Sequence, residues 1–169
     1  MASSAEVTPY IVNGTDTSVS VYPSYASIVT YIDYDDSSYQ VGARCGATII
    51  DSTYILTAAH CVASTDVSEV LRLFTIVLPQ LNNELDFDSI SEFENTTKYW
   101  VSDIYVHESY DSDNIENDIA ILKLETPLSV PSSAYAQFVS NESSYRGGVS
   151  EVYTAVGHGN TQTGVDANP

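Results

Sequence analysis

The most conspicuous shortage in this chain is positive charge. Its 169 residues contain 5 Lys and Arg against 23 Asp and Glu, which gives a formal net charge of −18. The acidic residues are spread along the sequence and are not gathered in one tail. Because such a surface repels nucleic acids and anionic membranes, we expect neither as a partner. The composition fits a soluble extracellular protein, although acidity by itself mainly serves solubility.

Long apolar runs are also missing. No stretch approaches the ~18 residues that a membrane-spanning helix needs. The opening Met1-Ala2-Ser3-Ser4-Ala5 has neither the basic nor the apolar region of a secretion signal. We therefore expect that a signal was removed or that the chain begins inside a longer precursor. Three Asn-x-Ser/Thr triplets, which begin at Asn13, Asn95 and Asn141, are compatible with secretion.

Cysteine is scarce, with Cys45 and Cys61 standing 16 positions apart. No Cys-x-x-Cys pattern indicates a zinc or thiol-redox site. In an extracellular protein the pair would form one disulfide, which in the chain-entropy model contributes roughly 3 kcal/mol of stability. Two free buried thiols are the alternative. A disulfide here would also anchor the segment that carries His60.

What the chain has in quantity is aromatic and β-branched residues, including 13 Tyr. Runs of these residues are separated by turn-rich segments such as 35–38 and 111–114, a pattern typical of an all-β sandwich or barrel. Helix is expected to be sparse, with one short turn over 58–63. The segments predicted to be strands are 21–31, 47–56, 70–78, 100–107, 119–124 and 149–156.

Two stretches carry a resemblance to a known family. Tyr54-Ile55-Leu56-Thr57-Ala58-Ala59-His60-Cys61, preceded by Cys45-Gly46-Ala47-Thr48-Ile49-Ile50, resembles the histidine loop of trypsin-like (chymotrypsin-family) serine proteases. Asn117-Asp118-Ile119-Ala120-Ile121-Leu122, preceded by Val106-His107-Glu108-Ser109-Tyr110, resembles the aspartate segment of that family. The resemblance implies a chymotrypsin-like antiparallel β-barrel.

The resemblance also assigns chemical roles. A serine hydroxyl is a weak nucleophile, so it needs an imidazole to take its proton and a carboxylate to orient that imidazole. By the match, His60 is the general base and Asp118 is the triad acid. The competing interpretations are a structural histidine and a solvent-facing turn acid. His107 is expected to be structural.

The beginning of the chain also resembles the family. Ile11-Val12-Asn13-Gly14 is similar to the mature N-terminus that proteolysis creates in these proteases, so the preceding ten residues make the chain resemble a zymogen. Cleavage would follow Tyr10, whereas the usual activators prefer Lys or Arg. Near the other end, Ala155-Val156-Gly157-His158-Gly159 resembles the first strand of the second barrel, with His158 where Trp is usual.

The sequence contains no Gly-Asp-Ser-Gly-Gly segment, so the serine nucleophile of the family is not found in it. We expect four parts: a leader or propeptide-like segment (1–10), a first β-barrel with His60 and Asp118 (11–126), a connector (127–148) and the start of an incomplete second β-barrel (149–169). A chain of this kind is predicted to be inactive by itself. It is also predicted to be marginally soluble or to associate.

The acidic segment 82–95 has two interpretations. Its carboxylates, from Glu84 to Glu94, lie where some relatives of the family hold a calcium loop, and calcium takes oxygen ligands. The spacing does not match an EF-hand, so a solvated acidic loop is favoured. We expect no other cofactor and no other metal site.

Two functions from different classes follow. The first is a secreted trypsin-like serine endopeptidase that hydrolyses protein or peptide substrates, meets inhibitor proteins and is represented by a chain without its serine-bearing part. The second is a non-catalytic protease homologue that acts as a protein-binding module. Retention of both His60 and Asp118 favours the first. A purely structural surface domain has no feature in its support.

Overall fold

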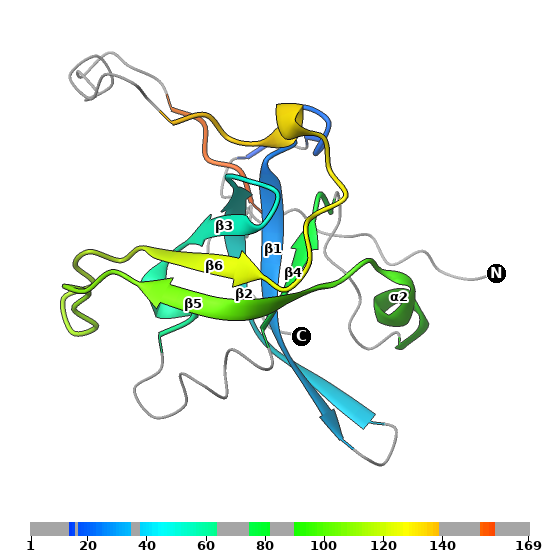
Figure 1. Ribbon diagram of the computed structural model, residues 1–169, viewed down its shortest axis with the longest axis horizontal. Helices are drawn as coiled ribbons and strands as arrows, with labels where there is room; N and C mark the ends of the chain where they lie inside the picture. The colour runs from blue at the N-terminus through cyan, green and yellow to red at the C-terminus, as the bar shows by residue number, and fades with distance from the viewer. Residues whose placement is uncertain are drawn as a thin grey trace.

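The computed structural model describes residues 14–15, 17–34, 38–63, 75–81, 90–138 and 153–157. Six antiparallel strands close into one barrel, in the order β1-β2-β3-β6-β5-β4, with β4 also paired to β1 (Figure 1). The strands are β1 (Tyr25–Tyr34), β2 (Ser38–Ile49), β3 (Tyr54–Thr57), β4 (Thr75–Pro79), β5 (Tyr99–Val106) and β6 (Ala120–Leu124). The predicted all-β class and antiparallel barrel are therefore confirmed.

The interior of the barrel follows from strand alternation. In β6 every second residue (Ala120, Leu122 and Leu124) is buried, while Ile121 and Lys123 between them are only partly buried. Because successive side chains of a strand point to opposite faces, this alternation places one face of β6 in the core. The inward residues of the other strands complete one cluster that also includes Ile49 and Ile55.

One predicted strand, 47–56, is wrong. The structure divides it into the end of β2 and all of β3, with a turn between Ile49 and Tyr54. The Asp51 side chain accepts hydrogen bonds from the Thr53 backbone N–H at 3.2 Å and from the Ser52 hydroxyl at 3.1 Å. Aspartate commonly forms such local turns, and here the turn reverses an otherwise continuous apolar run. The other four barrel strands were located correctly, with shifted ends.

A helix that the sequence did not predict, α2 (Ile90–Asn95), lies against the outside of the barrel. Its Phe93 packs with Val29, Ile76 and Leu78 in a second apolar cluster, so β4 is buried on both faces. After the helix, the Lys98 ammonium donates to backbone carbonyls, including that of Phe93, and stands 4.5 Å from the Phe93 ring centroid. A cation stabilises the end of a helix where carbonyls lack partners.

The segment after β6 runs along the barrel. Leu128 and Ala134 are buried, and the Leu128 and Ala136 amides donate to the carbonyls of Ser52 and Ile49 at 2.7 and 2.8 Å. A short 3-10 turn, η2, spans Ser132–Ala134. These contacts attach the first part of the expected connector to the barrel.

The strand predicted over 149–156 is wrong in its described part, because residues 153–156 belong to no strand. A strand needs a hydrogen-bonded neighbour, and the barrel strands of the described chain already pair with one another. Within the described ranges, no helix is long and apolar enough to cross a membrane.

Candidate active site

The barrel brings His60 and Asp118 together because they extend from neighbouring strands. His60 lies in the 3-10 turn η1 (Ala59–Cys61), which follows β3 almost directly. Asp118 lies two positions before β6. Strands β3 and β6 pair antiparallel with Thr57 opposite Ala120, so the end of one strand meets the start of the other. The short turn expected over 58–63 is therefore present and carries the histidine.

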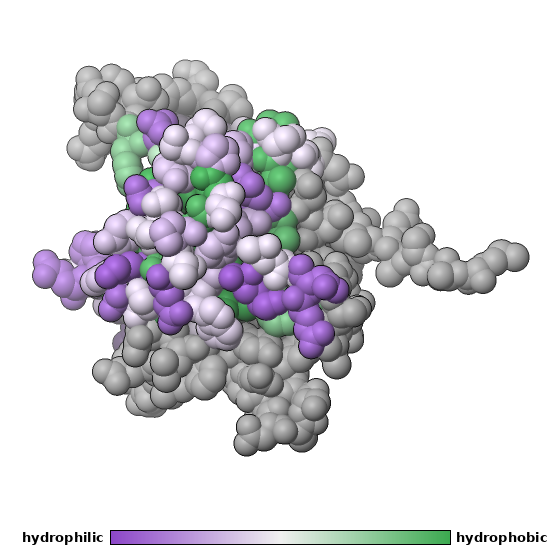
Figure 2. Space-filling model, turned by 45° about the vertical axis from the view of Figure 1, so that its right-hand side comes forward, coloured by the Kyte–Doolittle hydropathy of each residue, from purple (hydrophilic) through white to green (hydrophobic). Residues whose placement is uncertain are grey.

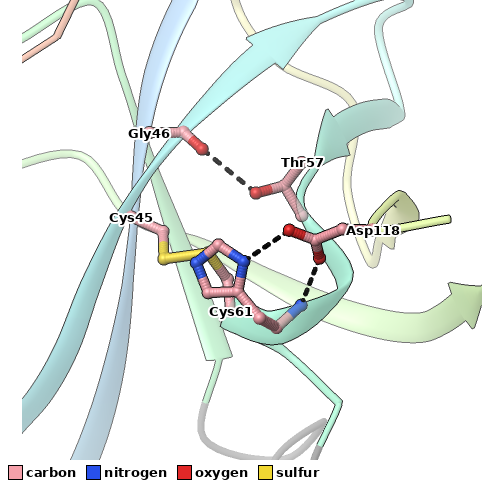
Figure 3. A network of polar contacts seen from close by, with 6 residues as sticks. Cys45, Gly46, Thr57, Cys61 and Asp118 are labelled. Carbon is pink, nitrogen blue, oxygen red and sulfur yellow. Dashed lines mark hydrogen bonds and ion pairs between the residues drawn. A yellow bond between two sulfur atoms is a disulfide. The ribbon is translucent and has the colours of Figure 1, made fainter. Parts of the chain in front are cut away.

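The Asp118 carboxylate contacts His60 through both of its oxygens. Oδ2 lies 2.7 Å from the ring Nδ1, and Oδ1 accepts the backbone N–H of His60 at 2.8 Å (Figure 3). A carboxylate beside Nδ1 favours the tautomer in which Nδ1 carries the proton and Nε2 keeps its lone pair. The arrangement can hold a neutral imidazole with a basic nitrogen directed away from the carboxylate.

The two His60 groups that contact Asp118 also keep its carboxylate ionised. The backbone N–H of His60, followed by its ring N–H, stabilises the carboxylate and lowers the pKa of Asp118 below the usual value of aspartate. The side chain of Asp118 is 19% exposed, whereas that of His60 is 53% exposed. The pair is therefore open to solvent on the histidine side.

Asn117 supports this geometry, a role that the sequence did not reveal. Its backbone has a φ of 53°, in the left-handed region that asparagine tolerates better than most residues. Its side-chain amide donates to the Ser109 carbonyl at 2.9 Å, and its own carbonyl accepts the Ile119 N–H at 2.8 Å. Asn117 thus fixes the turn that delivers Asp118. In the sequence, the indication of this role was that Asn117 directly precedes Asp118. The residue type alone did not reveal its left-handed backbone conformation.

A disulfide joins Cys45 on β2 to Cys61 at the end of η1, with their Cα atoms 6.2 Å apart (Figure 3). The free-thiol alternative is therefore wrong for this structure. Close by, the buried Thr57 donates its hydroxyl to the Gly46 carbonyl at 3.0 Å, which ties the end of β3 to β2. Both links hold the histidine turn against the neighbouring strand.

The free ring nitrogen of His60 also has a neighbour. Nε2 lies 3.4 Å from the disulfide sulfur of Cys61. Among the described residues, no serine or threonine hydroxyl is hydrogen-bonded to Nε2. The described part of the chain therefore pairs His60 with Asp118 and places no hydroxyl within hydrogen-bond distance of the other ring nitrogen.

His107 lies elsewhere. It is exposed, and its Nδ1 accepts the backbone N–H of Ser109 at 3.1 Å, a contact within its own loop. Tyr10, Ile11 and His158 lie outside the described residues, as does the larger part of the acidic segment 82–95 with Glu84. Glu94 is described as exposed on α2.

One group of possible metal ligands occurs in the described chain, formed by Cys45, His60 and Cys61, whose ligand atoms all lie within 4.8 Å of one another. In the oxidised protein the two sulfurs are bonded to each other, so they are not available as thiolate ligands.

Comparison with known proteins gives a consistent result. The family model described as Trypsin matches residues 31–168. Venom serine protease 34 of Apis mellifera is 34% identical over 122 residues, which covers 70% of this chain and 26% of the relative. Serine protease 7 of Drosophila melanogaster is 30% identical over 122 residues, with 70% and 30% covered. Coagulation factor XI of Bos taurus is 35% identical over 91 residues, with 54% and 13% covered.

Among solved structures, the scabies mite inactivated protease paralogue S-D1 matches with a TM-score of 0.53 and 16% identity, over 75% of this chain and 44% of that one. At this identity the match supports the fold alone. The chain spans between 12% and 35% of the length of six of the curated relatives that it matches.

Proposed function

This chain belongs to the trypsin family of serine proteases, and from that premise we propose that it forms the histidine- and aspartate-bearing part of a secreted serine endopeptidase. The observation that carries the proposal is the pair of His60 and Asp118, joined by a 2.7 Å contact to Nδ1 and a 2.8 Å bond from the backbone. A histidine with a purely structural role does not require a carboxylate that accepts hydrogen bonds from both its ring and its backbone N–H.

The proposed reaction is acyl transfer to a serine that lies outside these 169 residues. The serine oxygen attacks the carbonyl carbon of a peptide bond, and its proton passes to Nε2 of His60. Asp118 stabilises the imidazolium so formed. His60 then returns the proton to the leaving amine, and water releases the acyl group by the same route. By itself, the present chain holds the base and the acid but cannot complete this cycle.

Protein or peptide substrates and inhibitor proteins are the partners that this reaction implies. Secretion is supported by the disulfide between Cys45 and Cys61, because such bonds persist in oxidising compartments. The names of the relatives, which include venom proteases and a coagulation factor, also support secretion. We further propose that cleavage after Tyr10 exposes Ile11 as the N-terminus of the mature enzyme.

The proposal is tested on the natural protein that contains this chain, isolated from the secreted fraction. Its intact mass after deglycosylation and its N-terminal sequence come first, followed by labelling with a fluorophosphonate and hydrolysis of a peptide library. We expect a mass well above the 18.4 kDa of this chain. We also expect an N-terminus at Ile11 and a labelled serine.

Variants assign the roles within the pair. His60→Ala is expected to lower kcat by about 10⁶-fold. Asp118→Asn is expected to lower it by about 10⁴-fold, a magnitude taken from a protease of this same family. His107→Ala is the matched control, and its kcat should not change. A secreted protein that has the mature N-terminus but neither labels nor hydrolyses peptides would instead be a non-catalytic, protein-binding homologue.

A further inference from the structure

The contact between His60 and the disulfide has no role in the proposed proton transfer. Nε2 of His60 lies 3.4 Å from Sγ of Cys61, and the cluster also includes Cys45, with all ligand atoms within 4.8 Å of one another. Two sulfurs and one imidazole nitrogen are ligands that Zn²⁺ takes in proteins. The oxidised sulfurs cannot serve, but the same sulfurs as thiolates can.

We propose that reduction of the Cys45–Cys61 disulfide creates a Zn²⁺ site made of both thiolates and Nε2 of His60. A dithiol supplies the two electrons: its sulfurs form their own disulfide as the Cys45–Cys61 bond breaks, and its two protons pass to the cysteines. Zn²⁺ then displaces these two protons as it binds. The bound ion occupies the Nε2 lone pair that the general base needs.

The spacing of Cys61 and His60 already fits two ligands of one tetrahedral ion. With a Zn–S bond of about 2.3 Å and a Zn–N bond of about 2.0 Å, a sulfur and a nitrogen on one tetrahedron lie roughly 3.5 Å apart. The observed separation of Cys61 Sγ and His60 Nε2 is 3.4 Å. The Cα atoms of Cys45 and Cys61 are 6.2 Å apart, and the proposed site requires that their side chains rotate after reduction to direct both sulfurs at one ion.

The surroundings of His60 are also those of a zinc ligand. Histidines that bind zinc usually donate the other ring N–H to a carboxylate, which fixes the ring and makes the ligating nitrogen more basic. Asp118 Oδ2 stands 2.7 Å from Nδ1 and serves that purpose. Because the His60 side chain is 53% exposed, solvent reaches the site and water can take the fourth position.

The test uses the full chain, oxidised or reduced with a phosphine, which becomes a phosphine oxide and adds no competing thiol. Co²⁺ is the spectroscopic probe, since tetrahedral cobalt–thiolate sites give charge-transfer and d–d absorption. Zn²⁺ affinity is then measured by displacement of Co²⁺. We expect one tetrahedral Co²⁺ per reduced chain and none in the oxidised chain.

The variants separate this site from a nonspecific one. Cys45→Ser and Cys61→Ser should abolish the tetrahedral spectrum, and His60→Ala should change it and weaken binding. Asp118→Asn should weaken Zn²⁺ binding by about 10–100-fold, because it removes the carboxylate partner of the ligating histidine. The matched control, His107→Ala, changes an exposed histidine outside the cluster and should leave spectrum and affinity unchanged.

The proposal is overturned by the absence of a tetrahedral site in the reduced chain, by equal binding to the oxidised chain, or by binding that His60→Ala leaves unchanged. Circular dichroism is recorded in parallel. If reduction unfolds the barrel, Zn²⁺ must restore the sheet signal, because the ion bridges the same two sulfurs as the disulfide. Failure to restore it also rejects the site. None of these readouts depends on peptidase activity, so they are independent of the proposed function.

Discussion

Among single residues, Asp118 is kept ionised mainly by His60. His60 donates to it from the backbone and from the ring, and these bonds lower its pKa. The geometry favours the carboxylate as a partner of histidine over a turn acid that only faces solvent. By contrast, Asp111 is a turn acid. Its carboxylate accepts hydrogen bonds from the Asn114 side-chain amide and from the backbone N–H groups of Asp113 and Asn114, all within its own loop.

The lowered pKa of Asp118 predicts a pH-dependent contribution to stability. Because the folded pKa lies below the unfolded value of about 3.9, the contribution is fully present above pH ~4 and is lost as pH falls through the folded pKa. Asp118→Asn should therefore destabilise the oxidised chain at pH 7 and converge with wild type in acid. Urea unfolding at a series of pH values measures this. Asp113→Asn, an exposed neighbour, is the control, and a gap that stays constant down to low pH would contradict the prediction.

At the scale of elements, the contact between His60 and Asp118 was easier to predict than the ends of the strands. The motifs around His60 and Asp118 predicted that the two residues meet, and the pairing of β3 with β6 places them at one end of the barrel. The turn inside 47–56 was missed because a single Asp51 reverses a run that is apolar on both sides. Helix α2 was missed because it is short and gains its stability from packing of Phe93 against the barrel.

The loop before Asp118 contains a strained residue. Ile115 has a φ of 55° although it is β-branched, and it is 56% exposed. A side chain in this left-handed region costs roughly 1–2 kcal/mol, and asparagine tolerates it better. Since little apolar surface is buried here, Ile115→Asn should raise the free energy of unfolding by about 1 kcal/mol, or the melting temperature by about 2–4 °C.

Differential scanning calorimetry of the oxidised chain tests that prediction. Val21→Asn is the matched control, because Val21 is 62% exposed and is not among the residues with positive φ. It removes an exposed β-branched residue without relieving strain, so its melting temperature should not rise. Equal stabilisation by both variants would mean that the gain comes from replacing an exposed apolar side chain with a polar one, and not from relief of backbone strain at position 115.

For the whole molecule, charge is the dominant feature. The net charge of −18 leaves most carboxylates without a cation, and in the described chain one Lys–carboxylate pair is found, Lys123 with Asp103 at 3.6 Å. On the face shown in Figure 2, hydrophilic residues and residues of intermediate hydropathy cover most of the described surface, and apolar residues are exposed in separate small areas. Repulsion between chains therefore opposes the association that exposed apolar residues favour.

The salt concentration should determine whether charge repulsion or apolar association dominates. Tyr105 and Val106 at the end of β5 are 52% and 37% exposed, and Ile119, whose carbonyl accepts the N–H of His107, the residue after Val106, is 43% exposed. Raising NaCl from about 20 mM to about 0.5 M shortens the screening length to a few ångströms, so the oxidised chain should pass from monomer to larger species. Sedimentation velocity measures the change. Tyr105→Ser with Val106→Thr should reduce it, whereas Val21→Ser should not. A monomer at both salt concentrations would show that these apolar side chains do not drive association.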